Sequence, residues 1–183
     1  MARKISVTKD DILKAAFEVT LSEGLDSVTA RKVAAKAGCS TQPIFRVYKS
    51  MDDVHKDVFN LAAADFHSFA RAHNNDSRNL PFVGLGMSYI KYAIKKPELF
   101  RLLFLSQERY GMSLYELLNG EDGEIRREIE KAQRDGCASP ENLFMQMWIC
   151  IHGMACMSLT GDFDLSEEQS ITFLKERYYQ WKN

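Results

Sequence analysis

The sequence predicts an all-α protein in which a short three-helix N-terminal domain precedes a larger C-terminal helical bundle. Apolar residues recur three and four positions apart along most of the chain, whereas no alternating pattern typical of a strand persists. Several segments begin with a serine or threonine that is followed three residues later by an acidic or amide residue, as in a capping box. Several segments end at a glycine, which accepts the left-handed conformation that closes a helix.

About nine helices account for this pattern. The first begins after Thr8, whose hydroxyl and the Asp11 carboxylate can satisfy each other's free amides, and ends at Gly24. Thr29 can cap the second helix, and Pro43 falls in the first turn of the third, where no internal hydrogen bond is lost. A glycine-punctuated stretch at 111–123 is expected to be irregular. The expected helices span about 9–23, 30–37, 41–47, 51–73, 81–95, 97–108, 122–135, 140–159, and 167 to near the C-terminus.

Composition is that of a globular protein rather than a membrane or disordered one. Of the 183 residues, 45% are apolar and 27% are charged, and no apolar run approaches the roughly 18 residues of a membrane span. No signal-peptide stretch follows the basic start, and the four cysteines form no CxxC, so we expect a cytoplasmic protein without a membrane partner. Up to His55, nine basic residues outnumber seven acidic ones, which is the sign expected of a surface that faces nucleic acid.

The second and third helices have the spacing of a helix-turn-helix, because Gly38 and a capping serine, Ser40, separate them. In this motif the first helix supports the second, whose N-terminal residues lie against base edges in the major groove of double-stranded DNA. We therefore expect residues 1–50 to form a DNA-binding domain and residues 51–183 to form a domain for ligand sensing and dimerisation.

The helix-turn-helix geometry assigns roles to its exposed side chains. Gln42 can pair with adenine, and Arg46 can reach guanine or a phosphate. The side chains expected to face base edges are those of Thr41, Gln42, Pro43, Arg46 and Val47, and those expected near phosphates are Thr29, Arg31, Tyr48 and Lys49.

Residues 8–56 resemble the DNA-binding domain of the tetracycline-repressor (TetR) family. The resemblance implies a homodimer whose two recognition helices read a near-palindromic operator, and a C-terminal pocket whose ligand changes operator affinity. Trp148, His152 and Gly153 also resemble the Trp-His-Gly pattern of one branch of the family. The matching pieces of the N-terminal domain are the apolar helix at 12–17, Glu23-Gly24, Val28-Thr29, Val33-Ala34, Ala37-Gly38, Ser40, Ile44-Phe45 and Tyr48-Lys49-Ser50.

The sequence departs from the family pattern at three positions. The family usually has tyrosine where Phe45 stands, with its hydroxyl on a phosphate, and phenylalanine where Tyr48 stands. It also often has lysine at Met51, where the side chain grips the DNA backbone. The resemblance therefore places Phe45 at the DNA, and the loss of two backbone contacts implies weaker non-specific affinity with a shallower salt dependence.

The C-terminal part is rich in methionine and aromatic residues, which form pockets for apolar ligands or pack as core. Trp148 and His152 lie one helical turn apart and share a face, so His152 is either a satisfied core histidine or a group that orients a ligand. The residues expected to line a ligand pocket are Phe66, Tyr92, Phe104, Trp148 and His152.

The last two expected helices offer surfaces for a homodimer. Apolar residues near the C-terminus recur at spacings of three and four, and such a strip needs a partner in the same subunit or in another. A glycine inside a helix costs about 1 kcal/mol relative to alanine, which close approach of another helix would offset. The residues expected at the interface are Gly153, Ile171, Leu174, Tyr178 and Trp181.

The sequence lacks the patterns of catalytic, metal and cofactor sites: its four histidines show no HxxxH or HExxH spacing, and no P-loop, GxSxG or GxGxxG occurs. We therefore predict a transcriptional regulator, most simply a repressor, whose DNA affinity is modulated by an apolar small molecule. The alternatives are a DNA-binding regulator without an effector and, more distantly, a helical enzyme without DNA binding. A redox switch through Cys39, which borders the recognition helix, is a further variant.

Overall fold

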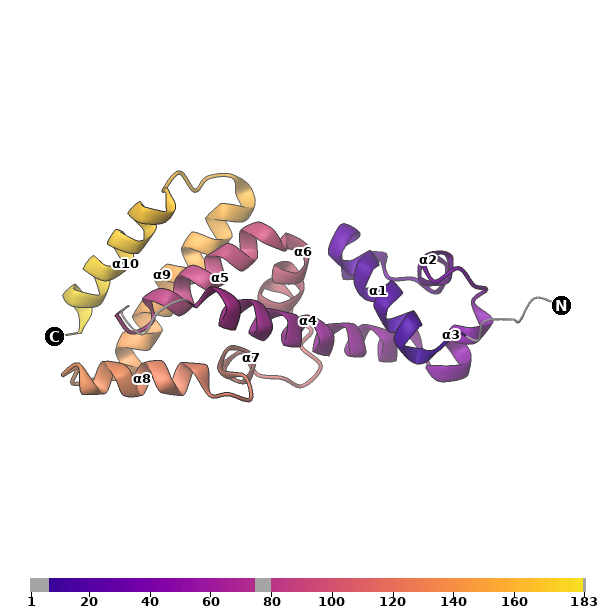
Figure 1. Ribbon diagram of the computed structural model, residues 1–183, viewed down its shortest axis with the longest axis horizontal. Coiled ribbons are helices and arrows are strands. Elements are labelled where there is room, and N and C mark those ends of the chain that lie inside the picture. Colours follow the sequence, from indigo (N-terminus) through magenta and orange to yellow (C-terminus); the bar gives the residue numbers. More distant parts are fainter. Residues whose placement is uncertain (1–6, 75–79, 183) are drawn as a thin grey trace. The chain divides into compact units, whose positions relative to one another are not determined.

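A computed structural model of the protein describes residues 7–74 and 80–182 (Figure 1). All regular elements in these two stretches are helices, which confirms the all-α prediction. A short 3-10 turn, Leu25–Ser27, and a π-helical turn, Arg101–Leu105, accompany them. The α-helices are α1 (Lys9–Glu23), α2 (Ala30–Lys36), α3 (Gln42–Val47), α4 (Met51–His73), α5 (Val83–Lys95), α6 (Pro97–Phe100), α7 (Leu114–Asn119), α8 (Glu124–Arg134), α9 (Pro140–Thr160) and α10 (Glu167–Trp181).

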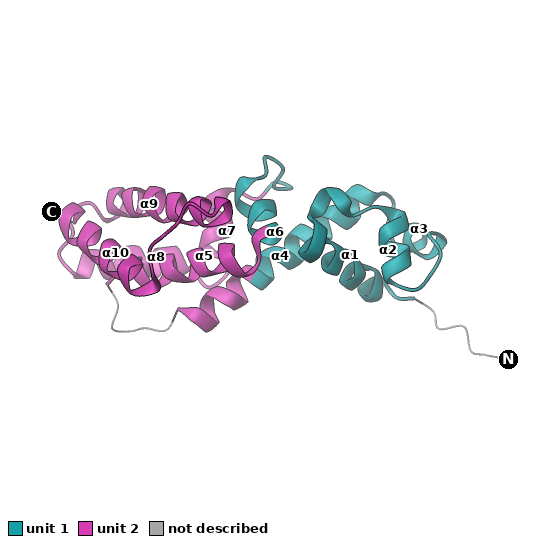
Figure 2. Ribbon diagram, turned by 90° about the horizontal axis from the view of Figure 1, so that it is seen from above, with its two compact units in different colours: residues 1–65, 98–111 teal, residues 66–97, 112–183 magenta. Residues whose placement is uncertain are grey.

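The chain divides into two compact units (Figure 2). The first unit contains residues 1–65 and 98–111, and the second contains residues 66–97 and 112–183. Helix α4 contributes its first part to the first unit and its last part, from Phe66, to the second. The expected division into a DNA-binding domain at 1–50 and a ligand-sensing and dimerisation domain at 51–183 is a functional one, and it stays a prediction.

Four helices share the core of the first unit. Ile12, Val33, Ile44 and Val54 come from α1, α2, α3 and α4 respectively, and all four side chains are fully buried. The predicted capping box at Thr8 is present in α1, since the Thr8 hydroxyl accepts from the Asp11 amide and the Asp11 carboxylate accepts from the Thr8 amide. These contacts fix the short helices α2 and α3, which are too short to be stable alone.

Helices α5 and α9 form the centre of the second unit and pack closely against each other. The approach is close at Gly86 of α5, where a Cβ atom would lie 2.5 Å from Cδ1 of Ile151 on α9. Helix α10 packs on both helices and buries Leu174 and Tyr178 completely. The Tyr178 hydroxyl also donates a hydrogen bond of 2.7 Å to the Asp135 carboxylate at the end of α8.

Helix α9 is strongly apolar, although the sequence contains no uninterrupted apolar run of the length of a membrane span. By length and composition it could cross a membrane, with a mean hydropathy of 1.3 over its most apolar window, of which 28% of residues are buried. A core helix of a soluble protein meets the same criterion, and α9 packs against α5, α8 and α10. Its outer face leaves Met145, Ile149 and Met157 exposed.

Three predicted features differ from the structure. The stretch at 111–123, expected to be irregular, contains α7, which begins with a capping box between Ser113 and Glu116. The single helix expected at 97–108 is instead the short α6 followed by the π-helical turn, which ends where the Ser106 amide bonds to the Arg101 carbonyl. Helix α3 begins at Gln42, with Thr41 rather than Ser40 at its N-cap position.

Candidate nucleic-acid interface and pocket

Helix α3 presents one outward face in the first unit. Ile44 is fully buried and Tyr48, directly after the helix, is nearly so, and together they anchor α3 to the core. The opposite face is exposed, with Phe45 exposed by 53% and Val47 by 43%. At spacings of three and four residues, this outward face carries Gln42, Phe45 and Arg46, all exposed. Lys49, also exposed, follows the helix after the extended Tyr48.

The turn between α2 and α3 positions this face. Gly38 adopts a φ of +66°, which favours glycine, and the Cys39 amide then bonds back to the Ala34 carbonyl. Before α2, the Thr29 hydroxyl accepts a hydrogen bond from the Lys32 amide, as the sequence predicted. Helix α4 is tied to the same region because Nε2 of His55 lies 2.8 Å from the Val28 carbonyl oxygen.

Exposed cations near α3 fall into two groups. Lys32 and Lys36 on α2 are paired with Glu23 and Glu18 of α1 at 2.5 and 3.2 Å. By contrast, the exposed side chains of Arg31, Arg46 and Lys49 form no ion pair with the described part of the chain. These three cations are therefore the ones available to phosphates.

Tyr48 is the residue whose predicted role the structure contradicts. Its side chain is only 4% exposed, and its hydroxyl donates a 3.1 Å hydrogen bond to the Asp57 carboxylate of α4. The Lys9 ammonium lies 2.7 Å from the same carboxylate and 4.9 Å from the centre of the Tyr48 ring. Burial, together with Asp57, raises the pKa of the Tyr48 hydroxyl, which stays protonated and belongs to the core rather than to a phosphate-binding surface.

The other predicted DNA contacts lie together around α3 and the start of α2. Thr41 and Pro43 are half-buried at the start of α3, and the remaining members are exposed. The set that the structure places on this surface comprises Thr29, Arg31, Ser40, Thr41, Gln42, Pro43, Phe45, Arg46, Val47 and Lys49.

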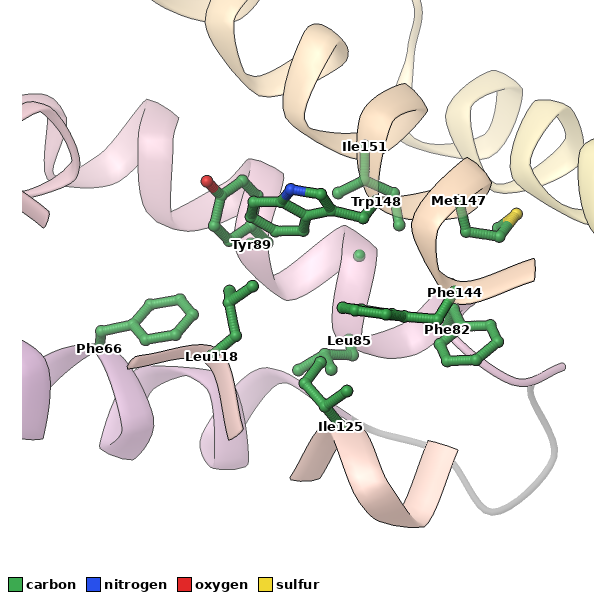
Figure 3. Close-up of a pocket in the computed structure, with 11 residues that line it drawn as sticks. Phe66, Phe82, Leu85, Tyr89, Leu118, Ile125, Phe144, Met147, Trp148 and Ile151 are labelled. Carbon is green, nitrogen blue, oxygen red and sulfur yellow. The ribbon is translucent and has the colours of Figure 1, made fainter. Parts of the chain in front are cut away.

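A pocket lies in the second unit, where side chains from five helices surround a common space (Figure 3). The space between the side chains amounts to about 380 Å³ including its open mouth. Five of the lining side chains are aromatic, and none is charged. The lining residues are Phe66, Phe82, Leu85, Gly86, Tyr89, Leu118, Ile125, Phe144, Met147, Trp148 and Ile151.

Tyr89 is the centre of the aromatic wall. Its ring lies edge-on to Trp148, with centroids 4.9 Å apart at 68°, and perpendicular to Phe66 at 6.0 Å. Its hydroxyl lies 2.9 Å from Nδ1 of His152, whose Nε2 lies 3.6 Å from the Cys156 sulfur. Burial lowers the pKa of His152, so the imidazole is neutral at pH 7 and can serve Tyr89 as a hydrogen-bond partner.

Phe82 forms the wall of the pocket at the start of α5. Its backbone is left-handed, with a φ of 66°, which is unusual for a residue with a side chain. The buried Glu128 carboxylate of α8 accepts a 2.7 Å hydrogen bond from the Phe82 amide, and Lys131 pairs with the same carboxylate at 2.5 Å. Glu128 therefore holds the first residue of the pocket wall in place.

The residues predicted for a ligand pocket lie at different places relative to this space. Phe66 and Trp148 line the pocket, while His152 reaches it through Tyr89, and Tyr92 packs behind Phe66 at 5.1 Å. Phe104 does not line this pocket, because it belongs to the first unit, where it is buried beside Phe100. The sequence reasoning missed Phe82, Leu85, Gly86, Tyr89, Leu118, Ile125, Phe144, Met147 and Ile151.

The residues predicted for a dimer interface also divide into two groups. Leu174 and Tyr178 are fully buried within the subunit, which contradicts their predicted role. Ile171 and Trp181 are half-buried, and Gly153 is exposed, with no atom within 4 Å of the position that a Cβ would occupy.

The described residues contain no group of three or more histidine, cysteine, aspartate or glutamate side chains able to hold a metal ion. A helix-turn-helix with an exposed second helix is the arrangement with which DNA-binding proteins read the major groove.

Comparison with known families supports this class. Residues 12–58 match the family described as "Bacterial regulatory proteins, tetR family", and residues 82–176 match "Tetracyclin repressor-like, C-terminal domain". The chain therefore belongs to the TetR family of transcriptional regulators, as the sequence resemblance predicted. The Trp-His-Gly branch stays a prediction.

Solved structures share the fold at low sequence identity. A TetR-like transcriptional regulator from Rhodococcus sp. RHA1 has a TM-score of 0.65 at 15% identity, with 98% of this chain and 97% of that chain covered. A putative TetR-family regulator from Rhodococcus sp. has a TM-score of 0.66 at 16% identity, with coverages of 95% and 98%. The multidrug binding protein EbrR, in complex with imidazole, has a TM-score of 0.55 at 18% identity, with coverages of 92% and 93%. No curated protein sequence matches the chain.

Proposed function

We propose that the protein is a cytoplasmic, homodimeric repressor whose affinity for a near-palindromic operator changes when a small molecule binds in the pocket of the second unit. The observation that carries the proposal is the outward face of α3, where Gln42 and Arg46 are exposed while Ile44 and Tyr48 hold the helix to the core. Side chains of these types pair with base edges in the major groove.

The DNA contacts follow from this face. Gln42 is suited to adenine and Arg46 to guanine, and the unpaired cations Arg31 and Lys49 are suited to the flanking phosphates. In a two-fold dimer the two α3 helices enter major grooves about 34–36 Å apart, which is one turn of DNA.

The exposed face of α9 supports a homodimer. Met145, Ile149, Gly153 and Met157 follow one another at intervals of four residues, and all are exposed in the subunit. Because the space above Gly153 is open, the backbone of a partner helix can approach there closely. This surface replaces Leu174 and Tyr178 in the proposed interface, with Ile171 and Trp181 at its side.

The pocket favours a regulator that is controlled by a small-molecule ligand over a regulator that has no effector. Its wall is almost wholly apolar and aromatic, as in sites for small apolar molecules. One structural neighbour is described as a multidrug binding protein, in complex with imidazole. A ligand that binds the DNA-free conformation more tightly lowers operator affinity by the same factor, because coupling between two sites is reciprocal.

Fluorescence anisotropy with DNA flanking the protein's own gene tests the DNA-binding part of the proposal. Arg46→Ala and Gln42→Ala should weaken binding to the specific fragment by about tenfold or more, since each good base contact contributes about 1–3 kcal/mol. Arg134→Ala, which removes the same charge from an exposed position on α8, is the matched control and should leave affinity unchanged. Equal affinity of the wild type for the fragment and for a random duplex would contradict the proposal.

A further inference from the structure

The charge of the pocket wall restricts the kind of ligand. None of the lining residues carries a charged side chain, so an ion in the pocket would lose its hydration without gaining a partner of opposite charge. The attraction between a cation and the faces of aromatic rings is small compared with that loss. The composition of the wall therefore favours an uncharged ligand.

Neither Glu124 nor Glu128, the two buried carboxylates of α8, is among the residues that line the pocket. Both oxygens of Glu128 are engaged, one by the Phe82 amide and the other by Lys131. Glu124, only 6% exposed, has one carboxylate oxygen without a hydrogen-bond partner, and burial raises its pKa. The charged groups that act on Glu124 are His67, Arg71, Asp122 and Arg127, none of which lines the pocket.

The polar atoms of the wall are confined to two side chains. Only Tyr89 and Trp148 carry side-chain oxygen or nitrogen atoms among the lining residues, and Figure 3 shows these two atoms at the same edge of the pocket. The Tyr89 hydroxyl is held by His152, and the Trp148 indole N–H has no hydrogen-bond partner in the described part of the chain. An indole N–H is a donor only, so it selects a hydrogen-bond acceptor.

From these observations we infer that the pocket takes an uncharged, largely apolar molecule that presents one hydrogen-bond acceptor to the edge formed by Tyr89 and Trp148. The inference rests on the proposed function, because it specifies the effector of the same pocket. It excludes lipophilic cations and aromatic carboxylates as the preferred class.

Three probes with the same naphthalene ring test the effect of ligand charge on binding. 2-Acetylnaphthalene is neutral and carries a hydrogen-bond acceptor, the trimethyl(2-naphthyl)ammonium ion is a cation, and 2-naphthoate is an anion. Isothermal titration calorimetry with the full chain should show that the neutral probe binds at least tenfold more tightly than either ion. Trp148→Phe keeps a ring but removes the donor, and it should weaken 2-acetylnaphthalene by about fivefold while leaving unsubstituted naphthalene unchanged. Tyr115→Phe, which likewise removes a side-chain donor but at an exposed position outside the lining, is the matched control and should change neither.

The outcomes also distinguish this inference from the function on which it rests. Tighter binding of the cation than of the neutral probe, especially if Glu124→Gln abolishes it, would overturn the neutral-ligand inference and leave a ligand-controlled regulator standing. Equal effects of Trp148→Phe on both neutral compounds would overturn the assigned hydrogen bond. Failure of all the probes to bind would overturn the inference and the pocket as an effector site together, whereas DNA binding is measured separately.

Discussion

Replacing Gly86 with alanine tests the close packing of α5 against α9. In an exposed helix interior this change stabilises by about 1 kcal/mol, because glycine loses more backbone entropy on folding. Here the added Cβ would lie 2.5 Å from Cδ1 and 2.9 Å from Cγ1 of Ile151, so that side chain must shift. Overpacking of this kind costs about 1–3 kcal/mol. We therefore expect Gly86→Ala to lower the free energy of unfolding by about 0–2 kcal/mol.

A double-mutant cycle assigns the effect to this contact. Ile151→Val removes the nearest atom and alone costs about 0.5–1.5 kcal/mol, but with Gly86→Ala the combined loss should be smaller than the sum. Ile149→Val, at an exposed position on the same helix, should be additive with Gly86→Ala. Urea denaturation at two protein concentrations measures these values and separates dimerisation from folding. A stabilisation of about 1 kcal/mol by Gly86→Ala alone would refute the packing argument.

Three further predictions concern separate parts of the chain. Tyr48→Phe removes the hydrogen bond to Asp57 and should lower stability by about 1 kcal/mol in thermal unfolding, with operator affinity in anisotropy unchanged; a selective loss of DNA affinity would return Tyr48 to the interface. Glu124→Gln should raise stability at pH 7, because burial raises the folded-state pKa of this carboxyl. The penalty develops as pH rises above about 4.5, the ordinary pKa of a glutamate, and is fully present above the raised folded-state pKa. Urea titrations below about pH 4.5 should therefore show no difference, and a difference that persists there would contradict the assignment. Gly153→Ala should weaken dimerisation in analytical ultracentrifugation while leaving the subunit folded, since the added Cβ meets no side chain or neighbouring element within 4 Å; an unchanged dimer would exclude this face.

Local signals in the sequence were sufficient for most helix boundaries. The capping boxes at Thr8 and Ser166 and the proline at position 140 mark the starts of α1, α10 and α9, because each acts within one turn of the chain. The same type of signal was present at Ser113 and Glu116 but was outweighed by the surrounding glycines, so α7 was missed.

The partner of a side chain that lies on a different helix was harder to predict from the sequence. Tyr48 follows α3 at a position where an exposed hydroxyl is plausible, yet its partner, Asp57, lies on another helix. Leu174 and Tyr178 form an apolar strip that could cover its own subunit or a second one, and packing against α5 and α9 decides between them. Periodicity defines a face but does not identify its partner.

The pocket was the least predictable feature, because it exists only where five helices meet. Trp148 drew attention through its spacing from His152, whereas Leu118, Ile125 and Phe144 have no local signal that separates them from ordinary core. The largely apolar stretch at 81–90 was a usable sign in the sequence, since a helix that is apolar on all sides is buried at the centre of its unit.

The central claim is that a small molecule bound in the pocket of the second unit changes the affinity of the same protein for its operator. The direct test is an anisotropy titration of the operator fragment with and without saturating 2-acetylnaphthalene, using wild-type protein and the Trp148→Phe variant. The account predicts at least a tenfold rise in the operator dissociation constant for the wild type, with the half-effective ligand concentration shifted upward in the variant. Operator affinity that stays constant while calorimetry shows the pocket occupied would contradict the account and identify a DNA-binding regulator without this effector.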